Sequence, residues 1–318
     1  MKVGIVGAGA VGSACLLSLV LRGPSCDIVL VNRHRKKAEG VVTDMQYGTV
    51  LTPAVNVRTG DFADLEGASL VMVTAGVNEK SGGATDRRDA AGRLRLLEAN
   101  AGIYEEIVPQ VIRYAAEAVM LVVTDPPDPL ADVARILGHR HVLSTGTFLD
   151  TLRFRFHLAR FLKVNPAYVD ALVLGEHGTS SVFVWSSARV GGRPVLDLLG
   201  ESGQSHEDIR QKIEHEVRYA NITIIEGIDA SQYGIGIVCA QIAEMVLRNE
   251  QSVIPVGSYQ PKYGVTLSLP TVLGRQGVSR IIDPEISDQE QRGLERSAEA
   301  LKRALGRLDL GARLPKSA

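Results

Sequence analysis

The stretch Lys2-Val3-Gly4-Ile5-Val6-Gly7-Ala8-Gly9-Ala10-Val11-Gly12 determines the fold that we predict for this chain. It has the pattern of a buried strand followed by a glycine turn, and the apolar residues 13–21 continue as a helix. Gly7, Gly9 and Gly12 form a GxGxxG pattern in the strand-to-helix setting where it binds a dinucleotide. Side chains at these positions would block the turn, hold the pyrophosphate away and push the helix off the strand. The first domain is therefore predicted to bind a dinucleotide.

Strand-like apolar runs alternate with helical or polar segments through the first half of the chain. The runs after the first are residues 27–31, 55–58, 70–74, 119–124 and 141–143. Such alternation is typical of a parallel sheet covered by helices. Because the alternation ends near residue 146, we expect an α/β protein with a Rossmann doubly wound parallel sheet in residues 1–146 and a mixed α+β substrate domain in residues 147–318.

The composition is that of an ordinary globular protein, with 318 residues of which 45% are hydrophobic and 22% charged. The formal net charge is −1 and both signs are spread along the chain, so we expect neither a nucleic-acid partner nor a membrane partner. No apolar run reaches the roughly 18 residues of a transmembrane helix. The cysteines, Cys15, Cys26 and Cys239, form no CxxC pair, which favours free thiols and a cytoplasmic location. The histidines lack metal-ligand spacing, so no metal site is predicted.

The end of the second strand bears on the choice of cofactor. Dinucleotide-binding folds usually carry an acid there, which accepts hydrogen bonds from the adenosine ribose. This chain has Asn32 instead, followed by Arg33 and further basic residues. An uncharged side chain beside arginines tolerates a 2′-phosphate, so we expect NAD and keep NADP as an alternative.

A long polar segment follows the strand at residues 70–74. It runs from Asn78 to Gly92, and helical periodicity resumes at Arg93. Loops beyond roughly 12–15 residues are uncommon in compact domains unless they bind or cover something. This segment is therefore predicted to be an active-site lid.

The segment Ala171-Leu172-Val173-Leu174-Gly175-Glu176-His177-Gly178 ends an apolar run with a histidine between two glycines. Glycines let the backbone turn sharply, and histidine exchanges protons near neutral pH. A histidine after a strand is, on its own, more often structural than catalytic. The neighbouring motifs described below make His177 a candidate proton donor.

The last helix has a start signal of its own. Ser287 and Glu290 have the spacing of a capping box. An apolar stripe follows, which is typical of a helix packed on the body of a protein. Its members are Leu294, Ala298, Leu301, Leu305 and Leu308.

Several motifs, taken in order, resemble the L-lactate/malate dehydrogenase family over nearly the whole chain. They are Gly7-Ala8-Gly9-Ala10-Val11-Gly12, Thr74-Ala75-Gly76, Leu149-Asp150-Thr151-Leu152-Arg153-Phe154-Arg155, Leu174-Gly175-Glu176-His177-Gly178 and Val272-Leu273-Gly274-Arg275. The LDxxR and GEHG motifs together are specific to this family, whereas the glycine motif alone is not. The resemblance implies a divergent member, most similar to a lactate dehydrogenase, acting as an NAD(P)-dependent L-2-hydroxy acid dehydrogenase.

The resemblance also implies a role for each motif residue. His177, hydrogen-bonded to Asp150, would give its proton to the oxygen of a 2-keto acid while the nicotinamide delivers a hydride. Arg153 would hold the substrate carboxylate through two parallel hydrogen bonds, and Arg93 would swing in with the lid to polarise the carbonyl. The residues expected to bind the cofactor are Gly7, Gly9, Gly12, Asn32, Arg33, Thr74, Ala75, Gly76, Asn100 and Thr124.

Asp125 departs from the family pattern, which has an asparagine whose amide contacts the substrate oxygen. An ionised carboxylate there would oppose the negative charge that builds on this oxygen. Three alternatives stay open. Asp125 is protonated in the closed site, or it turns away, or the substrate carries a cationic group.

Counted from Ala75-Gly76, Glu79 occupies the lid position that, by the family resemblance, is glutamine in lactate dehydrogenases and arginine in malate dehydrogenases. Its charge would repel a second carboxylate, which favours a monocarboxylic substrate over oxaloacetate. The lid is about eight residues longer than usual by our count, so Arg87 or Arg88 is an alternative occupant of this position. Ser231 is expected near the substrate side chain.

The predicted function is therefore hydride transfer between a nicotinamide cofactor and a small L-2-hydroxy/2-keto acid, with a monocarboxylate favoured. One alternative is malate dehydrogenase, which requires Arg87 or Arg88 to reach the pocket. Another is a reductase of a keto acid or imine that bears a cationic group. A dinucleotide sensor without activity is disfavoured, because it needs no proton donor such as His177. The resemblance further implies a homodimer or homotetramer.

Overall fold

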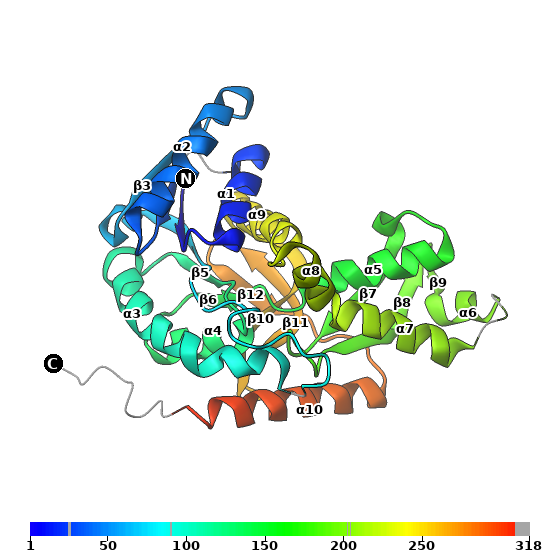
Figure 1. Cartoon of the computed structure of the whole chain (residues 1–318). Coiled ribbons are helices and arrows are strands. Elements are labelled where there is room, and N and C mark those ends of the chain that lie inside the picture. Colours follow the sequence, from blue (N-terminus) through cyan, green and yellow to red (C-terminus); the bar gives the residue numbers. More distant parts are fainter. Residues whose placement is uncertain (25–26, 90, 202, 204, 309–318) are drawn as a thin grey trace.

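A computed structural model of the protein describes residues 1–24, 27–89, 91–201, 203 and 205–308 (Figure 1). Its strands are β1 (Lys2–Val6), β2 (Asp27–Val31), β3 (Asn56–Gly60), β4 (Ala68–Val73), β5 (Val119–Val122), β6 (Val142–Ser144), β7 (Val169–Leu174), β8 (Val182–Val190), β9 (Arg193–Pro194), β10 (Ser252–Gln260), β11 (Val265–Gly274) and β12 (Gly277–Ile281). Its α-helices are α1 (Ala10–Arg22), α2 (Arg35–Gly48), α3 (Leu97–Ala115), α4 (Pro127–Ile136), α5 (Phe148–Leu162), α6 (Val195–Gly200), α7 (His206–Arg218), α8 (Ala220–Ile228), α9 (Tyr233–Arg248) and α10 (Asp288–Leu305). Short 3₁₀ turns are η1 (Thr49–Leu51), η2 (Phe62–Leu65), η3 (Gly92–Leu96) and η4 (Pro166–Tyr168).

The strands of the described residues form a nine-stranded sheet in the order β12-β11-β10-β6-β5-β4-β1-β2-β3 and a three-stranded sheet in the order β7-β8-β9. The part from β6 to β3 is parallel throughout. Helices cover both faces of this part, with α1 and α9 on one side and α3 and α4 on the other (Figure 1). The predicted Rossmann fold is confirmed.

Alternate side chains of the central strands enter two separate cores. Ile28 and Leu30 of β2 pack in the core beneath α1 and α9, whereas Val29 and Val31 pack in the core beneath α3 and α4. Both faces are therefore buried, as expected of a parallel sheet between helix layers. This explains why the strands read as continuous apolar runs in the sequence.

The second half of the chain contributes to both sheets. Strands β10, β11 and β12 extend the large sheet in antiparallel fashion, and Gly257 of β10 pairs with Ser144 of β6. The small sheet packs with α5, α6 and α7 in a core of its own, on the side of the molecule away from β3 (Figure 1). The expected division after residue 146 falls between β6 and α5, but the large sheet continues across it.

Two helices differ from their predicted course. Helix α4 was not predicted from the sequence of the proline-rich segment after β5. Proline fits the first helical turn, where the backbone N–H has no partner within the helix, so α4 begins at Pro127. The apolar run 209–228 predicted one helix, but the chain bends at Tyr219 and forms α7 and α8.

Helix α9 packs along α1 on one face of the large sheet. Gly236 permits this close approach, because a Cβ there would lie 2.7 Å from the backbone of Ala14. Cys15 and Cys239 are buried on these helices as free thiols, as predicted. The third cysteine, Cys26, lies outside the described residues.

The predicted capping box of the last helix is confirmed. The Ser287 side chain accepts a hydrogen bond from the Glu290 backbone, and the Glu290 carboxylate accepts one from the Ser287 backbone. Helix α10 then runs along the base of the molecule in Figure 1. Its residues Leu294, Ala298 and Leu301 are buried on the inner face of the helix.

The length and hydropathy of the helices bear on whether any of them could span a membrane. Among the described residues, no single helix is long and apolar enough to cross a membrane. Helices α8 and α9 meet both criteria only when counted together, across a bend of 118°.

Candidate active site

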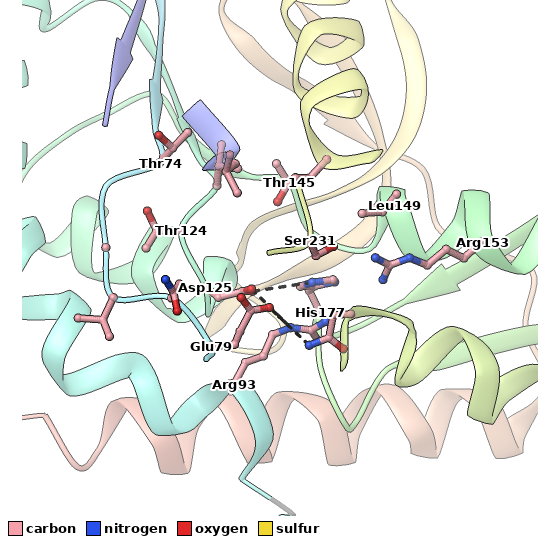
Figure 2. Close-up of a pocket in the computed structure, with 17 residues that line it drawn as sticks. Thr74, Glu79, Arg93, Thr124, Asp125, Thr145, Leu149, Arg153, His177 and Ser231 are labelled. Carbon is pink, nitrogen blue, oxygen red and sulfur yellow. Dashed lines mark hydrogen bonds and ion pairs between the residues drawn. The ribbon is translucent and has the colours of Figure 1, made fainter. Parts of the chain in front are cut away.

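A pocket opens at the carboxyl ends of the parallel strands, where Thr74 follows β4, Asp125 follows β5 and Thr145 follows β6 (Figure 2). This is where ligands bind in open α/β sheets. Its volume of about 100 Å³ is below the roughly 300–1,000 Å³ typical of drug-sized ligands, so it suits a small molecule. The lining residues are Val11, Thr74, Gly76, Val77, Asn78, Glu79, Arg93, Val123, Thr124, Asp125, Thr145, Leu149, Arg153, His177, Asn221, Ser231 and Ile235.

His177 and Asp150 form a hydrogen-bonded pair at this pocket. His177 Nδ1 lies 2.5 Å from Asp150 Oδ2, and both side chains are largely buried. Burial alone would raise the pKa of Asp150, but the facing charges of His177, Arg153 and Arg93 hold this pKa well below its usual range. Asp150 is therefore ionised, and it can orient the imidazole and stabilise its cationic form.

The backbone at His177 is fixed by a carboxyl group that the sequence did not reveal. Asp128 Oδ2 accepts a hydrogen bond of 2.7 Å from the His177 backbone N–H, and Asp128 Oδ1 accepts one of 2.6 Å from Ser144 Oγ. Burial raises the pKa of Asp128 to about 7. Asp128 and His177 are 49 positions apart in the chain, and no local pattern links them.

Arg153 enters the pocket from α5, three residues after Asp150. This spacing places both side chains on one face of the helix, and Arg153 Nη1 donates a hydrogen bond of 3.1 Å to Asp150 Oδ1. Figure 2 shows the guanidinium pointing toward His177. Burial lowers the pKa of Arg153, and the Asp150 charge opposes this effect. A planar cation beside the proton donor can hold a carboxylate in two parallel hydrogen bonds.

Arg93 lies next to the carboxyl groups of Glu79 and Asp125, near His177 (Figure 2). Its Nε atom is 3.5 Å from Asp125 Oδ2 and 3.9 Å from Glu79 Oε1. Arg93 was expected to begin a helical segment and to swing into the site with the lid. It belongs to the 3₁₀ turn η3 and is already buried in the pocket, because the two acids hold it there.

Glu79 and Asp125 lie close to each other as well as to Arg93. Burial and the nearby Asp125 charge raise the pKa of Glu79 to about 7, against the opposing charge of Arg93. Asn221 Nδ2 donates a hydrogen bond of 3.4 Å to Glu79 Oε1. Asp125 Oδ1 lies 3.8 Å from His177 Nε2, so Asp125 does not turn away from the site.

The predicted lid contacts α8. Lys80 pairs with Asp229, and Arg87 donates hydrogen bonds to Glu226 and Thr223. These contacts hold Arg87 outside the pocket. Arg88 is 91% exposed and pairs with Asp86. Neither arginine lines the pocket, as the malate dehydrogenase alternative requires, whereas Glu79 does.

The glycine turn fits the phosphates of a dinucleotide. Gly7 has φ of +118°, and a Cβ there would lie 2.7 Å from the Ala75 backbone. A Cβ on Gly12 would lie 1.9 Å from the Gly7 oxygen, whereas one on Gly9 would meet no atom within 4 Å. The space at Gly9 adjoins the first turn of α1, which no side chain caps. A pyrophosphate can therefore approach the helix N-terminus.

Two substitutions in this turn should have different effects. Gly9→Ala should weaken NADH binding by about tenfold while leaving the melting temperature unchanged, because the methyl group takes up phosphate space only. Gly12→Ala should lower the free energy of unfolding by about 1–3 kcal/mol through overpacking against Gly7. Calorimetric titration with NADH and thermal melts of the free protein measure the two effects. Equal losses of stability in both variants would contradict the assignment of Gly9 to the phosphates.

The other residues expected to bind the cofactor surround this turn. Asn32 Oδ1 accepts a hydrogen bond from the Ala8 backbone, and Arg33 is exposed beside it. Thr74 and Thr124 bond to backbone oxygens of the turn and of Ala75. Gly76 lines the pocket, where a Cβ would strike Thr124.

Asn100 is placed behind the pocket rather than in its lining. Its side chain accepts a hydrogen bond from the Val77 backbone and donates others to the carbonyls of Val77 and Asp125. All these contacts are to the backbone, so Asn100 fixes the segments that carry Glu79 and Asp125. Asn221 and Leu149 line the pocket but were not among the predicted site residues.

A glycine cradle for a dinucleotide, a buried His–Asp pair and two arginines in one pocket define a dinucleotide-dependent oxidoreductase. The comparisons with known proteins agree. The NAD-binding domain of lactate/malate dehydrogenase matches residues 1–141, and the α/β C-terminal domain of lactate/malate dehydrogenase matches residues 147–308. The chain belongs to the lactate/malate dehydrogenase family.

Similar proteins extend over almost the whole chain. An L-lactate dehydrogenase of Deinococcus radiodurans is 42% identical over 304 residues, covering 95% of this chain and 97% of that protein. One of Thermus aquaticus is 42% identical and covers 97% of this chain and 99% of its own. The crystal structure of minor L-lactate dehydrogenase from Enterococcus mundtii has a TM-score of 0.89 at 33% identity, covering 97% of this chain and 98% of that one. This chain is therefore a 2-hydroxy acid dehydrogenase that binds NAD(H).

Proposed function

We propose that this protein reduces a small monocarboxylic 2-keto acid to the L-2-hydroxy acid with NADH, and that pyruvate is its simplest substrate. The observation that carries the proposal is the cluster of His177, Asp150 and Arg153, which unites a proton donor, its orienting acid and a cation for a carboxylate. The curated relatives are L-lactate dehydrogenases, which supports the same activity.

Each charged residue of the pocket has a distinct role in the proposed reaction. Arg153 binds the substrate carboxylate and so fixes the keto carbon in the pocket. Bound NADH supplies the hydride to that carbon. His177 gives its Nε2 proton to the carbonyl oxygen, and Asp150 stabilises the imidazolium beforehand. Arg93 stabilises the charge that develops on the oxygen.

The preference for a monocarboxylate rests on Glu79. Its carboxyl group lines the pocket and no cation other than Arg93 is paired with it in the described residues. A second carboxylate on the substrate would meet this acid in a poorly solvated space, which costs free energy through like-charge repulsion. Arg87, which could have offset the repulsion, is paired with Glu226.

We propose NADH rather than NADPH as the preferred cofactor. Asn32 takes the place of the usual acid, and its amide oxygen is engaged by the Ala8 backbone. The basic residues after it do not all remain available for a 2′-phosphate, since Arg35 pairs with Glu39 and Asp61. Arg33 is the exposed cation on which an NADP preference would depend.

The substrate and cofactor preferences are tested by initial rates with a panel of keto acids. We expect kcat/KM for pyruvate with NADH to exceed that for oxaloacetate by about tenfold or more, which corresponds to roughly 1.4 kcal/mol of repulsion. The panel contains pyruvate, oxaloacetate, a branched 2-keto acid and one with a basic side chain, each with NADH and NADPH. A preference for NADPH would assign Arg33 to a 2′-phosphate.

The same panel distinguishes the alternatives. Faster reduction of oxaloacetate would contradict the role of Glu79 and favour a malate dehydrogenase. Turnover confined to the basic substrate would identify Glu79 and Asp125 as a binding site for a cation. Absence of turnover with every keto acid would contradict the proposed function.

We further propose a homodimer or homotetramer in the cytoplasm. Large apolar side chains are exposed on neighbouring elements, among them Leu21 of α1 (61%), Tyr233 of α9 (63%) and Leu51 of η1 (91%). Exposed apolar side chains of this size are candidates for burial against a second copy, and the mass of the protein in solution tests the proposal.

A further inference from the structure

Glu79 and Asp125 form an acid pair at the point where the reacting oxygen must lie. Asp125 reaches toward His177 Nε2 at 3.8 Å, and this nitrogen carries the proton to be transferred. Glu79 lies close to Asp125, within hydrogen-bonding reach of it, and Arg93 faces both acids (Figure 2). An oxygen that accepts the His177 proton therefore also lies next to Asp125.

Simultaneous ionisation of Glu79 and Asp125 is unfavourable in this poorly solvated pocket. Glu79 and Arg93 have side chains only 12% and 8% exposed, so water screens the pair poorly. Adjacent buried carboxylates generally retain one proton between them, because the second ionisation must overcome the charge of the first. The raised pKa of Glu79, to about 7, agrees with this expectation.

We propose that Glu79 and Asp125 hold one proton between them and that Asp125, carrying this proton when substrate is bound, donates a hydrogen bond to the carbonyl oxygen. The inference rests on the proposed function, since it describes the same reduction. The proton of the pair is not transferred. The carbonyl oxygen receives its proton from His177, and its carbon receives the hydride.

Substrate binding decides on which acid the proton lies. An ionised Asp125 would oppose negative charge on the carbonyl oxygen, whereas a protonated Asp125 stabilises it, as an amide would. Glu79 can take the remaining charge, because Arg93 lies 3.9 Å away and Asn221 donates to its Oε1 atom. Asp125 thus contacts the substrate, and Glu79 is a positioning residue that acts through Asp125.

The charges of the occupied pocket support a single proton on the pair. Arg93, Arg153 and protonated His177 are positive. Asp150, Glu176 and the substrate carboxylate are negative, so these acids already match the three cations before the pair is counted. A doubly ionised pair would add two unbalanced negative charges to a buried site, and the shared proton removes one of them. The charged and titratable groups that face the pair or its Arg93 partner are Arg93 of η3, Tyr104 of α3, Asp150 and Arg153 of α5, and Glu176 and His177 after β7.

The proposal predicts an unusual pattern among three variants. Glu79→Gln leaves Asp125 without a partner to take its charge, so kcat/KM for pyruvate should fall by about 100-fold, the effect of losing one donor to an oxyanion. Asp125→Asn supplies a permanent amide donor, so its kcat/KM should exceed that of the wild type by about tenfold above pH 7. The double variant should recover by about 100-fold or more over Glu79→Gln, well beyond the roughly tenfold gain that independent effects of the two substitutions would give. Glu299→Gln, on the outer face of α10, is the matched control and should behave as the wild type.

A purely structural role for Glu79 predicts a different result. The double variant would then gain over Glu79→Gln only the roughly tenfold that Asp125→Asn gains over the wild type, because the lost contacts to Arg93 and Asn221 are the same in both. That outcome, or a Glu79→Gln variant as fast as the wild type, overturns the proposal.

Infrared difference spectra measure the proton without turnover. The holoenzyme with NADH should show the carbonyl stretch of a protonated carboxylic acid that is lost as the pH rises through about 7. Asp128 titrates in the same range, so the assignment rests on the part of the signal that Glu79→Gln removes. Identical spectra of the wild type and Glu79→Gln would overturn the shared proton. If the wild type reduces no 2-keto acid, the proposed function fails and the catalytic role fails with it, while the spectra still decide whether the pair holds a proton.

Discussion

His177→Asn should reduce kcat for pyruvate reduction by about 1,000-fold or more, because general acid catalysis by a positioned histidine contributes roughly 10²–10⁴-fold. Asparagine keeps a polar side chain of similar size but has no proton to give. The His177 imidazole also forms the 2.5 Å contact with Asp150, which the shorter side chain cannot reproduce. Stopped-flow and steady-state rates with NADH and pyruvate measure the loss.

Cofactor binding separates this loss from misfolding. NADH affinity should stay within about twofold of the wild type, since the glycine turn and α1 do not depend on His177. His215→Asn, on the exposed face of α7, is the matched control and should keep full activity. Turnover by His177→Asn at the wild-type rate would contradict the assignment of the proton donor.

Asp150→Asn should reduce kcat by about 10³–10⁴-fold, although it changes the shape of the side chain very little. An amide at this position cannot stabilise the imidazolium, and its N–H₂ group favours the wrong imidazole tautomer, an effect of about 10⁴-fold in a comparable His–Asp pair. Burial opposes ionisation of Asp150, but the charges of His177, Arg153 and Arg93 favour it and lower the pKa of Asp150, and an amide has no charge to offer these cations in return. The measurement is kcat, with NADH and pyruvate saturating.

Separate measurement of kcat and KM shows why Asp150→Asn loses activity. Asparagine retains an oxygen for the hydrogen bond from Arg153, so KM for pyruvate should change by less than about threefold. Asp170→Asn is a control at a carboxylate that is 80% exposed, and its activity should equal that of the wild type. A large rise in KM with kcat preserved would indicate that Asp150 acts only by holding Arg153.

Much of the fold follows from local patterns. The bounds of β1 and β2 agree with the apolar runs, and the capping box at Ser287 starts α10. These features depend on neighbours in the chain, such as the turn at Gly7 or the period of a helix, so they can be read locally. Helix α4 escaped notice because proline is read as a breaker, although it fits a helix start.

The site was predicted in part. The motifs predicted that His177, Asp150 and Arg153 lie together; His177 and Arg153 line the pocket and Asp150 is hydrogen-bonded to both, while Glu79, found by counting along the chain, also lines the pocket. The support of His177 by Asp128 and the contact of Asn221 with Glu79 could not be read. They join segments that meet only when separate helices and sheets pack together.

The sequence by itself determined the dinucleotide fold and the family resemblance and singled out a candidate proton donor, because each lies in a contiguous motif whose geometry is local. Only the tertiary structure showed where the residues that differ from the family pattern lie and which side chains they contact. It placed Arg87 against Glu226 and gathered Glu79, Asp125 and Arg93 from three different segments. Burial and mutual distance set the charge of such a cluster, and neither quantity exists before the chain is folded.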